Sequence, residues 1–303
     1  MGVSTAGAGP AGAGSGDAGS GGAASDGLAD TSPRSAAVLG HPVDHSLSPV
    51  LHGAAYRALG LDGWTYERID CDAERLASVV DSSPGHRVGY SVTMPGKFAA
   101  LGYATEVSDR ARIVGSANTL VRRGDGWFAD CTDVDGVTGA LAEFDGLPTE
   151  PTAVVLGVGG TARPVLAGLA EAGATRVVLA SRRDNAGPAA ACGRALGLEI
   201  RTVLLSDESL AGEISRADIL VNTVPEPGIS ELTGLVARAN RVFDVLYDPW
   251  PTAAGSVAVA AGIPVVGGDV MLLHQAFGQV ELFTGRPAPR QAMASALAAA
   301  LGR

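Results

Sequence analysis

Lys97 is the only lysine in the chain, where lysine and arginine together number 22. It follows a short strand pattern that ends at Thr93-Met94-Pro95. A lysine can give up and take back a proton, whereas an arginine stays charged. An exposed surface charge is the usual role of a lysine, but a chain this rich in arginine would be expected to use arginine at an indifferent surface site. Proton transfer and a plain surface charge therefore both stay open for Lys97.

Two hydroxyl groups lie upstream in the segment H-S-L-S-P, at Ser46 and Ser48. In an extended loop, side chains two residues apart point the same way, so the two hydroxyls could bind a carboxylate or a polyol together. A helix pattern follows at 50–59, and serine is also a favoured residue at a helix N-cap. Ligand binding and capping are both compatible with this spacing.

A glycine-rich turn between Thr152 and Leu169 has the spacing of a dinucleotide-binding loop. Gly157, Gly159 and Ala162 follow an apolar strand pattern and fit G-x-G-x-x-G/A at the start of a helix pattern. The first glycine permits a tight turn, the second lets the backbone approach a pyrophosphate, and the alanine lets the helix pack on the strand. Free N–H groups at the helix start would face the phosphates. The alternative is an ordinary strand–turn–helix unit, because glycine-rich turns are common.

The residues after the next strand pattern favour NADP over NAD. An Asp or Glu at this point would bind the ribose 2′-hydroxyl of NAD, but the chain reads Ser181-Arg182-Arg183. Two guanidinium groups suit a 2′-phosphate. A solvated, charged turn is the alternative, and Asp184 lies nearby.

The elements that must position these groups alternate between strand and helix patterns, which predicts an α/β protein. In the first part we expect helices at 50–59, 73–81 and 134–144, and strands at 35–40, 64–69, 87–93, 117–122 and 127–130, the last two as a hairpin. In the second part we expect helices from 161 and at 186–196, 270–283 and 290–301, and strands at 153–156, 176–180, 200–204, 219–222, 241–245 and 263–266.

Composition sets further bounds. The 303 residues suffice for two domains. Residues 1–33 hold ten of the 42 glycines and no basic residue, so we expect a disordered tail there.

The three scattered cysteines match no metal site and suggest free thiols in a reducing compartment. A net charge of −10 argues against nucleic acid, and no apolar run is long enough to span a membrane. Without the basic start and apolar core of a signal peptide, a cytoplasmic protein is expected.

Taken together, the motifs resemble those of the shikimate dehydrogenase family from about residue 37 to residue 289. The segments that carry the resemblance are HSLSP at 45–49, SVTMPGK at 91–97, GSANTL at 115–120, CTDVDG at 131–136, the glycine loop at 157–163, DVLYDP at 244–249 and MLLHQA at 271–276. The resemblance implies an α/β substrate domain at 34–132 and a Rossmann-type, doubly wound parallel sheet at 133–267. It also implies that helices at 268–303 return to the first domain.

The same resemblance implies NADP-dependent interconversion of 3-dehydroshikimate and shikimate, without a metal. Lys97 and Asp133 would form the catalytic pair, and Ser46 and Ser48 would hold the substrate carboxylate. The ring hydroxyls would be held by Thr93, Asn118, Asp133, Tyr247 and Gln275. The coenzyme would lie against Gly157, Gly159, Gly160, Thr161, Ala162, Ser181, Arg182, Arg183, Gly268 and Met271, the last near the nicotinamide.

Three positions depart from the family pattern. Ser91 and Cys131 replace asparagines beside the catalytic positions, and Arg183 replaces a threonine. Two other functions stay open: a quinate or dual quinate/shikimate dehydrogenase, and a non-catalytic protein that binds the coenzyme or shikimate. A monomer and a homodimer are equally compatible with the sequence.

Overall fold

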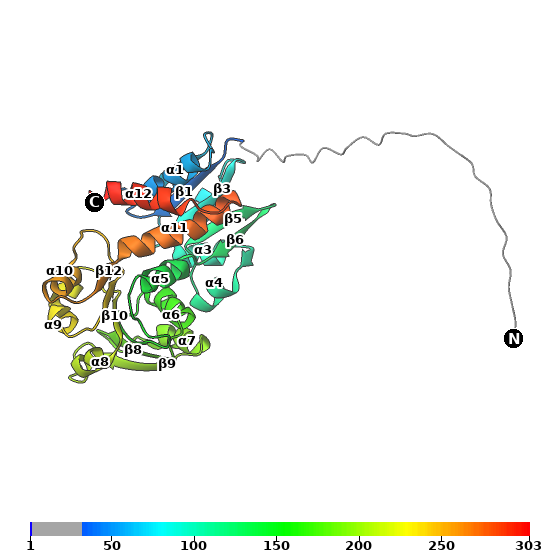
Figure 1. Cartoon of the computed structure of the whole chain (residues 1–303). Coiled ribbons are helices and arrows are strands. Elements are labelled where there is room, and N and C mark those ends of the chain that lie inside the picture. Colours follow the sequence, from blue (N-terminus) through cyan, green and yellow to red (C-terminus); the bar gives the residue numbers. More distant parts are fainter. Residues whose placement is uncertain (2–31) are drawn as a thin grey trace, which may run out of the picture. The chain divides into compact units, whose positions relative to one another are not determined.

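The computed structural model describes residue 1 and residues 32–303, so the tail expected at 1–33 lies almost entirely outside the described part. The described chain forms two six-stranded sheets that are covered by helices (Figure 1). The expected α/β class is confirmed.

The first sheet is mixed. Its strands, in spatial order, are β2 (Thr65–Asp70), β1 (Ser35–Gly40), β3 (Arg87–Val92), β5 (Thr119–Arg123), β6 (Gly126–Asp130) and β4 (Glu106–Val107). β1 pairs in parallel with β2 and β3, whereas β5 is antiparallel to both β3 and β6. The β5–β6 pair is the expected hairpin.

Helices cover both faces of this sheet because its central strands β1 and β3 are buried along nearly their whole length. On one face, α2 (Leu76–Asp81) and α3 (Lys97–Tyr103) pack against Leu39, Tyr90 and Leu120. On the other, α1 (Ser48–Ala58) lies over β2. A fourth helix, α4 (Asp109–Val114), begins at the N-cap Ser108 and packs near the second sheet's helices.

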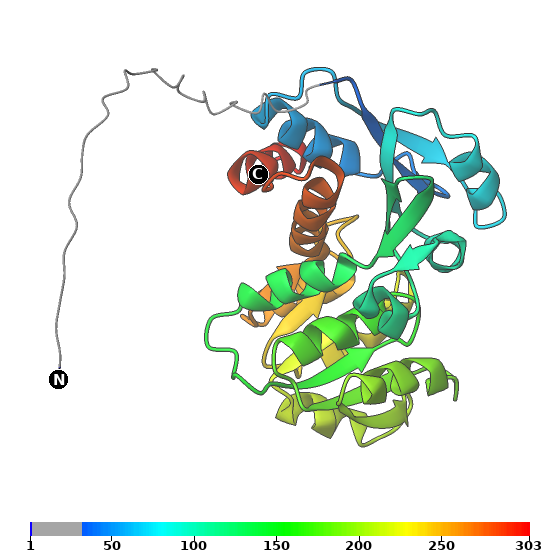
Figure 2. The same ribbon diagram turned by 90° about the vertical axis from the view of Figure 1, so that its right-hand side faces the viewer.

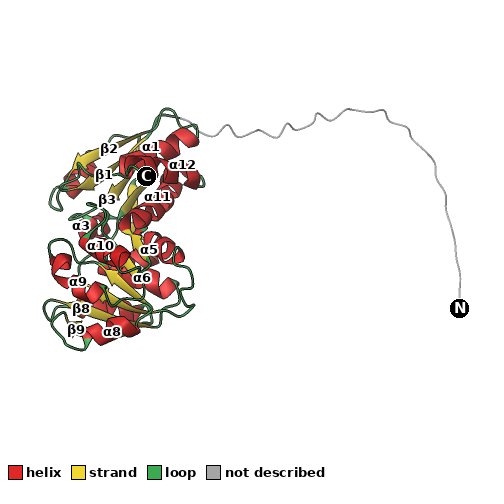
Figure 3. Cartoon of the chain, turned by 60° about the vertical axis from the view of Figure 1, so that its left-hand side comes forward, coloured by secondary structure: helices red, strands yellow, loops and turns green. Residues whose placement is uncertain are grey.

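The second sheet is entirely parallel. Its strands are β12 (Val265–Gly267), β11 (Val242–Asp244), β10 (Ile219–Asn222), β7 (Thr152–Leu156), β8 (Arg176–Ser181) and β9 (Glu199–Leu204), in that order. Read from β9, this is the 3-2-1-4-5-6 order of the Rossmann fold, which reverses direction between β7 and β10. Figure 3 shows the two sheets as separate groups of strands.

The buried run of β7 explains the helices on both faces of this sheet. Val155 faces a core with α5 (Asp133–Ala142), α6 (Ala162–Glu171) and α7 (Gly187–Ala195). Val154 and Leu156 face the opposite core, because side chains alternate along a strand. The elements on that side are α8 (Leu210–Arg216), the 3-10 helix η1 (Gly228–Leu232), α9 (Thr233–Val236) and α10 (Ala253–Ala260).

The last two helices return to the first sheet, as expected. α11 (Gly268–Thr284) and α12 (Arg290–Ala300) share a buried cluster with Leu51 and Ala55 of α1. Figure 2 shows them, coloured orange to red, beside the blue helix α1. Because α11 also packs closely on α5, it connects the two halves of the described chain.

Several short elements have no clear sequence pattern and were not expected: α3, β4, α8, η1, α9 and α10. One of these matters for function, because Lys97 is the first residue of α3 rather than the end of a loop. α11 also begins two residues earlier than expected, at Gly268. Within residues 32–303, no helix is long and apolar enough to cross a membrane.

Candidate active site

Lys97 and Asp133 form an ion pair between the first residues of two helices, α3 and α5. Nζ of Lys97 lies 2.5 Å from Oδ2 of Asp133, and the two side chains are 21% and 8% exposed. Burial by itself lowers the pKa of Lys97, but the charge of Asp133 and its hydrogen bond raise that pKa above the usual value overall. Lys97 is therefore an ammonium at neutral pH, held by a carboxylate and still accessible.

Asn118 fixes the other oxygen of the same carboxylate. Its Nδ2 donates to Oδ1 of Asp133 at 3.0 Å and lies 3.2 Å from Oε1 of Gln275. Its Oδ1 accepts the backbone N–H of Thr132 at 2.7 Å, which sets the direction of the amide. Four of the expected site residues, Lys97, Asn118, Asp133 and Gln275, therefore lie together.

Glycines allow α5 and α11 to cross closely enough for this contact. A Cβ on Gly136 would lie 2.6 Å from the backbone oxygen of Met271, and one on Gly139 would lie 2.1 Å from the ring of His274. On the facing helix, a Cβ on Gly278 would lie 2.9 Å from the Asp135 carboxylate. Small residues on both helices bring Gln275, one turn after Met271, up to Asn118.

The other expected substrate residues differ in how they are held. Ser46 and Ser48 are both buried, and Oγ of Ser46 accepts the N–H of Ser48 at 3.3 Å. The N-cap of α1 is Leu47, without a side-chain capping bond, but the Ser46 hydroxyl accepts the N–H of the first residue of that helix, one position earlier than an N-cap would. Thr93 and Tyr247 are partly buried, and within residues 32–303 neither side chain hydrogen-bonds to the Lys97–Asp133 pair.

A second polar network lies beneath the site and includes one of the substituted positions. Oγ of Ser91 accepts from the Tyr66 hydroxyl at 2.6 Å and donates to Oε1 of Gln279 at 2.7 Å. Nε2 of Gln279 donates to the backbone oxygen of Asn118 at 3.2 Å. His52 lies 3.3 Å from Oε1 of Gln279 and stacks on Tyr66. The serine therefore keeps both a donor and an acceptor role where the family has asparagine.

Cys131, the second substituted position, is fully buried. Burial raises the pKa of its thiol, so the side chain is neutral. Its backbone N–H donates to Oδ1 of Asp130 at 2.8 Å. The cysteine contributes to this site through its backbone rather than as a charged group.

The glycine-rich loop has the features that a pyrophosphate requires. Gly157 has φ +94°, and a Cβ there would lie 2.5 Å from Oγ1 of Thr223. Among the described residues, nothing lies within 4 Å of a Cβ at Gly159 or Gly160, so both positions face open space. Thr161 is the N-cap of α6 and makes no side-chain capping bond, while the N–H of Ala162 already donates to the backbone oxygen of Gly159 at 3.2 Å. The positive end of the helix dipole is directed at this loop, which favours an anion there. The loop lies between β7 and β10, where a Rossmann fold binds its ligand.

Beside that loop, Arg182 and Arg183 are exposed and follow β8, and Oγ of the buried Ser181 donates to the backbone oxygen of Arg183 at 2.6 Å. This bond orders the turn that carries the two guanidinium groups. Arg163, in the first turn of α6, lies over the ring of Phe98 at 5.3 Å. Through Arg163, the end of the glycine-rich loop therefore lies close to Phe98, the residue that follows Lys97 in α3.

Gly268 and Met271 begin α11. A Cβ on Gly268 would lie 2.1 Å from the backbone oxygen of Val245, so only glycine fits there without a shift. Met271 is buried in the core between α5 and α6. Both residues lie at the helix that also carries Gln275.

A Rossmann sheet with an open glycine loop, together with a lysine–carboxylate pair, defines a nicotinamide-nucleotide oxidoreductase. Residues 38–120 match the model of the shikimate dehydrogenase substrate-binding domain, and residues 270–298 match that of the shikimate 5′-dehydrogenase C-terminal domain. The chain belongs to the shikimate dehydrogenase family.

Curated relatives and solved structures agree. The NADP(+) shikimate dehydrogenase of Thermosynechococcus vestitus is 33% identical over 277 residues, which cover 88% of this chain and 95% of that protein. The crystal structure of the Mycobacterium tuberculosis shikimate dehydrogenase is 49% identical with a TM-score of 0.84, over 88% of this chain and all of that one. The Thermus thermophilus enzyme in complex with NADP(H) and shikimate is 32% identical with a TM-score of 0.75, over 88% and 100%.

Two groups of residues around the site were missed from the sequence. Gln279 lies four residues after Gln275, a helical spacing that could have predicted a second inward amide. Arg110 and Asp130 carry no local signal, because their contact joins α4 to the end of β6. Only the folded chain brings them together.

Proposed function

We propose that this protein is an NADP-dependent shikimate dehydrogenase that reduces 3-dehydroshikimate to shikimate reversibly, in the biosynthesis of aromatic amino acids. One observation carries the proposal: the 2.5 Å pair of Lys97 and Asp133, with Asn118 and Gln275 beside it, in a chain of this family. Reducing a ketone requires a hydride on carbon and a proton on oxygen.

In this proposal Lys97 supplies the proton. Its Nζ donates to the carbonyl oxygen during reduction and takes the proton back during oxidation. Asp133 keeps the amine charged and fixes its direction, and Asn118 holds the far oxygen of the carboxylate. Bound NADPH supplies the hydride. No covalent intermediate and no metal are needed.

The remaining roles follow from family membership and chemistry. Ser46 and Ser48 bind the substrate carboxylate, while Thr93, Asn118, Asp133, Tyr247 and Gln275 bind ring hydroxyls. Residues 157 and 159–162 hold the pyrophosphate, and Ser181, Arg182 and Arg183 hold the 2′-phosphate. Gly268 also contributes to the coenzyme site, and Met271 lies near the nicotinamide. We assign 34–132 to the substrate domain, 133–267 to the coenzyme domain and 268–303 to the returning helices. A cytoplasmic location and a monomer or homodimer fit this assignment.

The direct test supplies shikimate and NADP to the purified protein and follows the nicotinamide absorbance band. Quinate and NAD are supplied in the other three combinations. Turnover chiefly with shikimate and NADP supports the proposal, whereas equal rates with quinate would favour the dual enzyme. NAD is included as the second coenzyme because the Listeria monocytogenes relative, which is 25% identical, was solved in complex with shikimate and NAD. Protein that binds NADPH but never oxidises it with 3-dehydroshikimate would favour a non-catalytic role.

A further inference from the structure

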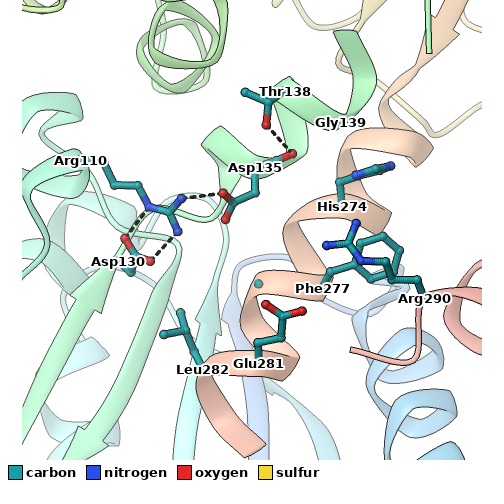
Figure 4. Close-up of a pocket in the computed structure, with 11 residues that line it drawn as sticks. Arg110, Asp130, Asp135, Thr138, Gly139, His274, Phe277, Glu281, Leu282 and Arg290 are labelled. Carbon is teal, nitrogen blue, oxygen red and sulfur yellow. Dashed lines mark hydrogen bonds and ion pairs between the residues drawn. The ribbon is translucent and has the colours of Figure 1, made fainter. Parts of the chain in front are cut away.

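Arg110 bridges the two ends of the segment that carries Asp133. Its Nε and Nη2 donate to the two oxygens of Asp130, at 2.7 and 2.6 Å, and its Nη1 donates to Oδ1 of Asp135 at 2.6 Å. Asp130 is the last residue of β6, and Asp135 lies in the first turn of α5. Figure 4 shows the guanidinium between the two carboxylates. We call these three residues the Arg110 bridge.

Within the Arg110 bridge, the Asp130 carboxylate is also held by two further donors. Oγ of Ser108 donates to Oδ1 of Asp130 at 2.6 Å, and the backbone N–H of Cys131 donates to the same oxygen at 2.8 Å. Asp130 is buried, and although burial raises the pKa of its carboxyl, the bonds from Arg110 and Ser108 lower that pKa overall. A charged, fully bonded carboxylate of this kind holds one position.

Asp133 lies between the two bridged residues but faces elsewhere. Residues two apart on a helix project in nearly opposite directions, so Asp135 turns to Arg110 while Asp133 turns to Lys97. Three directed bonds from one rigid guanidinium therefore fix both the strand end and the helix start on either side of Asp133.

We propose that Arg110 is a positioning residue for the Lys97–Asp133 pair: through the Arg110 bridge it sets where the Asp133 carboxylate lies without touching substrate or coenzyme. The proposal rests on the proposed function for its kinetic consequence, but not for its structural one. A displacement of about 1 Å at a reacting group can cost about 100-fold in rate.

A cavity beside the bridge makes a chemical test available. A cavity of about 700 Å³ is lined by Arg110, Asp130 and Asp135 on one side and by His274 and Arg290 on the other. Figure 4 shows Arg110, Asp130 and Asp135 on one side of this space and His274 and Arg290 on the other. Truncation of Arg110 would leave both carboxylates accessible from this cavity to a small cation such as guanidinium.

The experiment compares Arg110→Ala, Arg110→Lys and the control Arg112→Ala. Arg112 lies on the same helix, is 64% exposed, and donates to Asp109 and to the backbone oxygen of Val107 rather than to Asp130 or Asp135, so its loss should change nothing at the site. We expect kcat to fall about 100-fold in Arg110→Ala, with a smaller fall in Arg110→Lys and the NADPH dissociation constant unchanged in both. Millimolar guanidinium chloride should restore part of the turnover of Arg110→Ala but not alter Arg112→Ala, with sodium chloride as the salt control.

A readout without turnover separates this proposal from the proposed function. Because Lys97 is the only lysine, lysine labelled at Cε or Nζ gives one side-chain NMR signal. That signal should shift in Arg110→Ala and return with guanidinium, whether or not the wild type oxidises shikimate. If Arg110→Ala is folded and its lysine signal does not move, the positioning role is wrong. Wild-type kcat in folded Arg110→Ala and Arg110→Lys would also overturn it. A wild type without turnover would instead refute the proposed function alone.

Discussion

Lys97 and Asp133 lie 36 residues apart in the chain, yet Nζ of one is 2.5 Å from Oδ2 of the other. Each is the first residue of a helix, and both helices direct their N-termini to the same point. The positive end of α5 stabilises the Asp133 carboxylate as an anion, whereas that of α3 opposes the ammonium. The carboxylate is therefore what keeps Lys97 charged.

Coenzyme preference should depend on Arg182 and Arg183. Replacing both with glutamine removes charge-assisted hydrogen bonds to a 2′-phosphate, so the KM for NADP should rise by roughly 10- to 100-fold while that for NAD changes little. Arg176→Gln, at the opposite end of β8, is the matched control. Equal effects on both coenzymes would contradict the assigned contact.

The two directions of the reaction should respond to pH in opposite ways. The pKa of Lys97 is raised above its usual value, so its acid form prevails at neutral pH and its basic form is scarce. Oxidation of shikimate needs the basic form and should accelerate as pH rises, whereas reduction should decline only at alkaline pH. Initial rates in both directions across pH test this, and an oxidation rate that is flat from neutral to alkaline pH would count against Lys97 as the base.

Acid should destabilise the protein through His52. Burial lowers the pKa of this histidine from 6.5 to about 3 despite its bond to Gln279, so the folded state keeps it neutral. Its contribution to stability is fully present above about pH 6.5, and it is lost as pH falls toward 3, because only the unfolded chain takes up the proton there. Chemical denaturation of the wild type should show the free energy of unfolding falling over this range.

His52→Gln should make that pH dependence shallower, by up to about 1.4 kcal/mol per pH unit. His86→Gln removes an exposed histidine and serves as the control. An identical slope in wild type and His52→Gln would show that another group causes the acid sensitivity.

Gly136→Ala should separate α11 from α5. The new Cβ would lie 2.6 Å from a backbone oxygen and 2.8 Å from Cγ of Met271, which cannot be relieved by a side-chain rotation alone. We expect a loss of about 1–3 kcal/mol in stability and weaker shikimate binding, because Gln275 moves from Asn118. Gly102→Ala, where nothing lies within 4 Å, is the control and should be neutral or slightly stabilising. Thermal melts and titration with shikimate measure both effects.

Much of the fold could be predicted because its signals are local. The apolar run of β7, the turn at Gly157 and the hairpin of β5 and β6 each depend on neighbouring residues, and the structure confirms them. Short elements such as α3 could not be predicted, since tertiary packing rather than pattern stabilises them. The start of α3 is what places Lys97.

The candidate site was predictable in part, and the pairing of Lys97 with Asp133 only through the family motifs. Single-residue chemistry drew attention to Lys97, but nothing near it in sequence indicates Asp133 as its partner. The contacts of Gln279 with Ser91 and of Arg110 with Asp130 join distant segments and required the folded chain. Roles for Thr93 and Tyr247 stay predictions until a ligand is bound.

The most direct test of the central claim is the turnover of Lys97→Arg with shikimate and NADP. Arginine keeps the positive charge and can pair with Asp133, but it cannot exchange a proton near neutral pH. The account predicts that kcat falls by about 10²- to 10⁴-fold while the NADPH dissociation constant and the melting temperature stay close to wild type. Wild-type turnover in Lys97→Arg would contradict proton transfer by this residue.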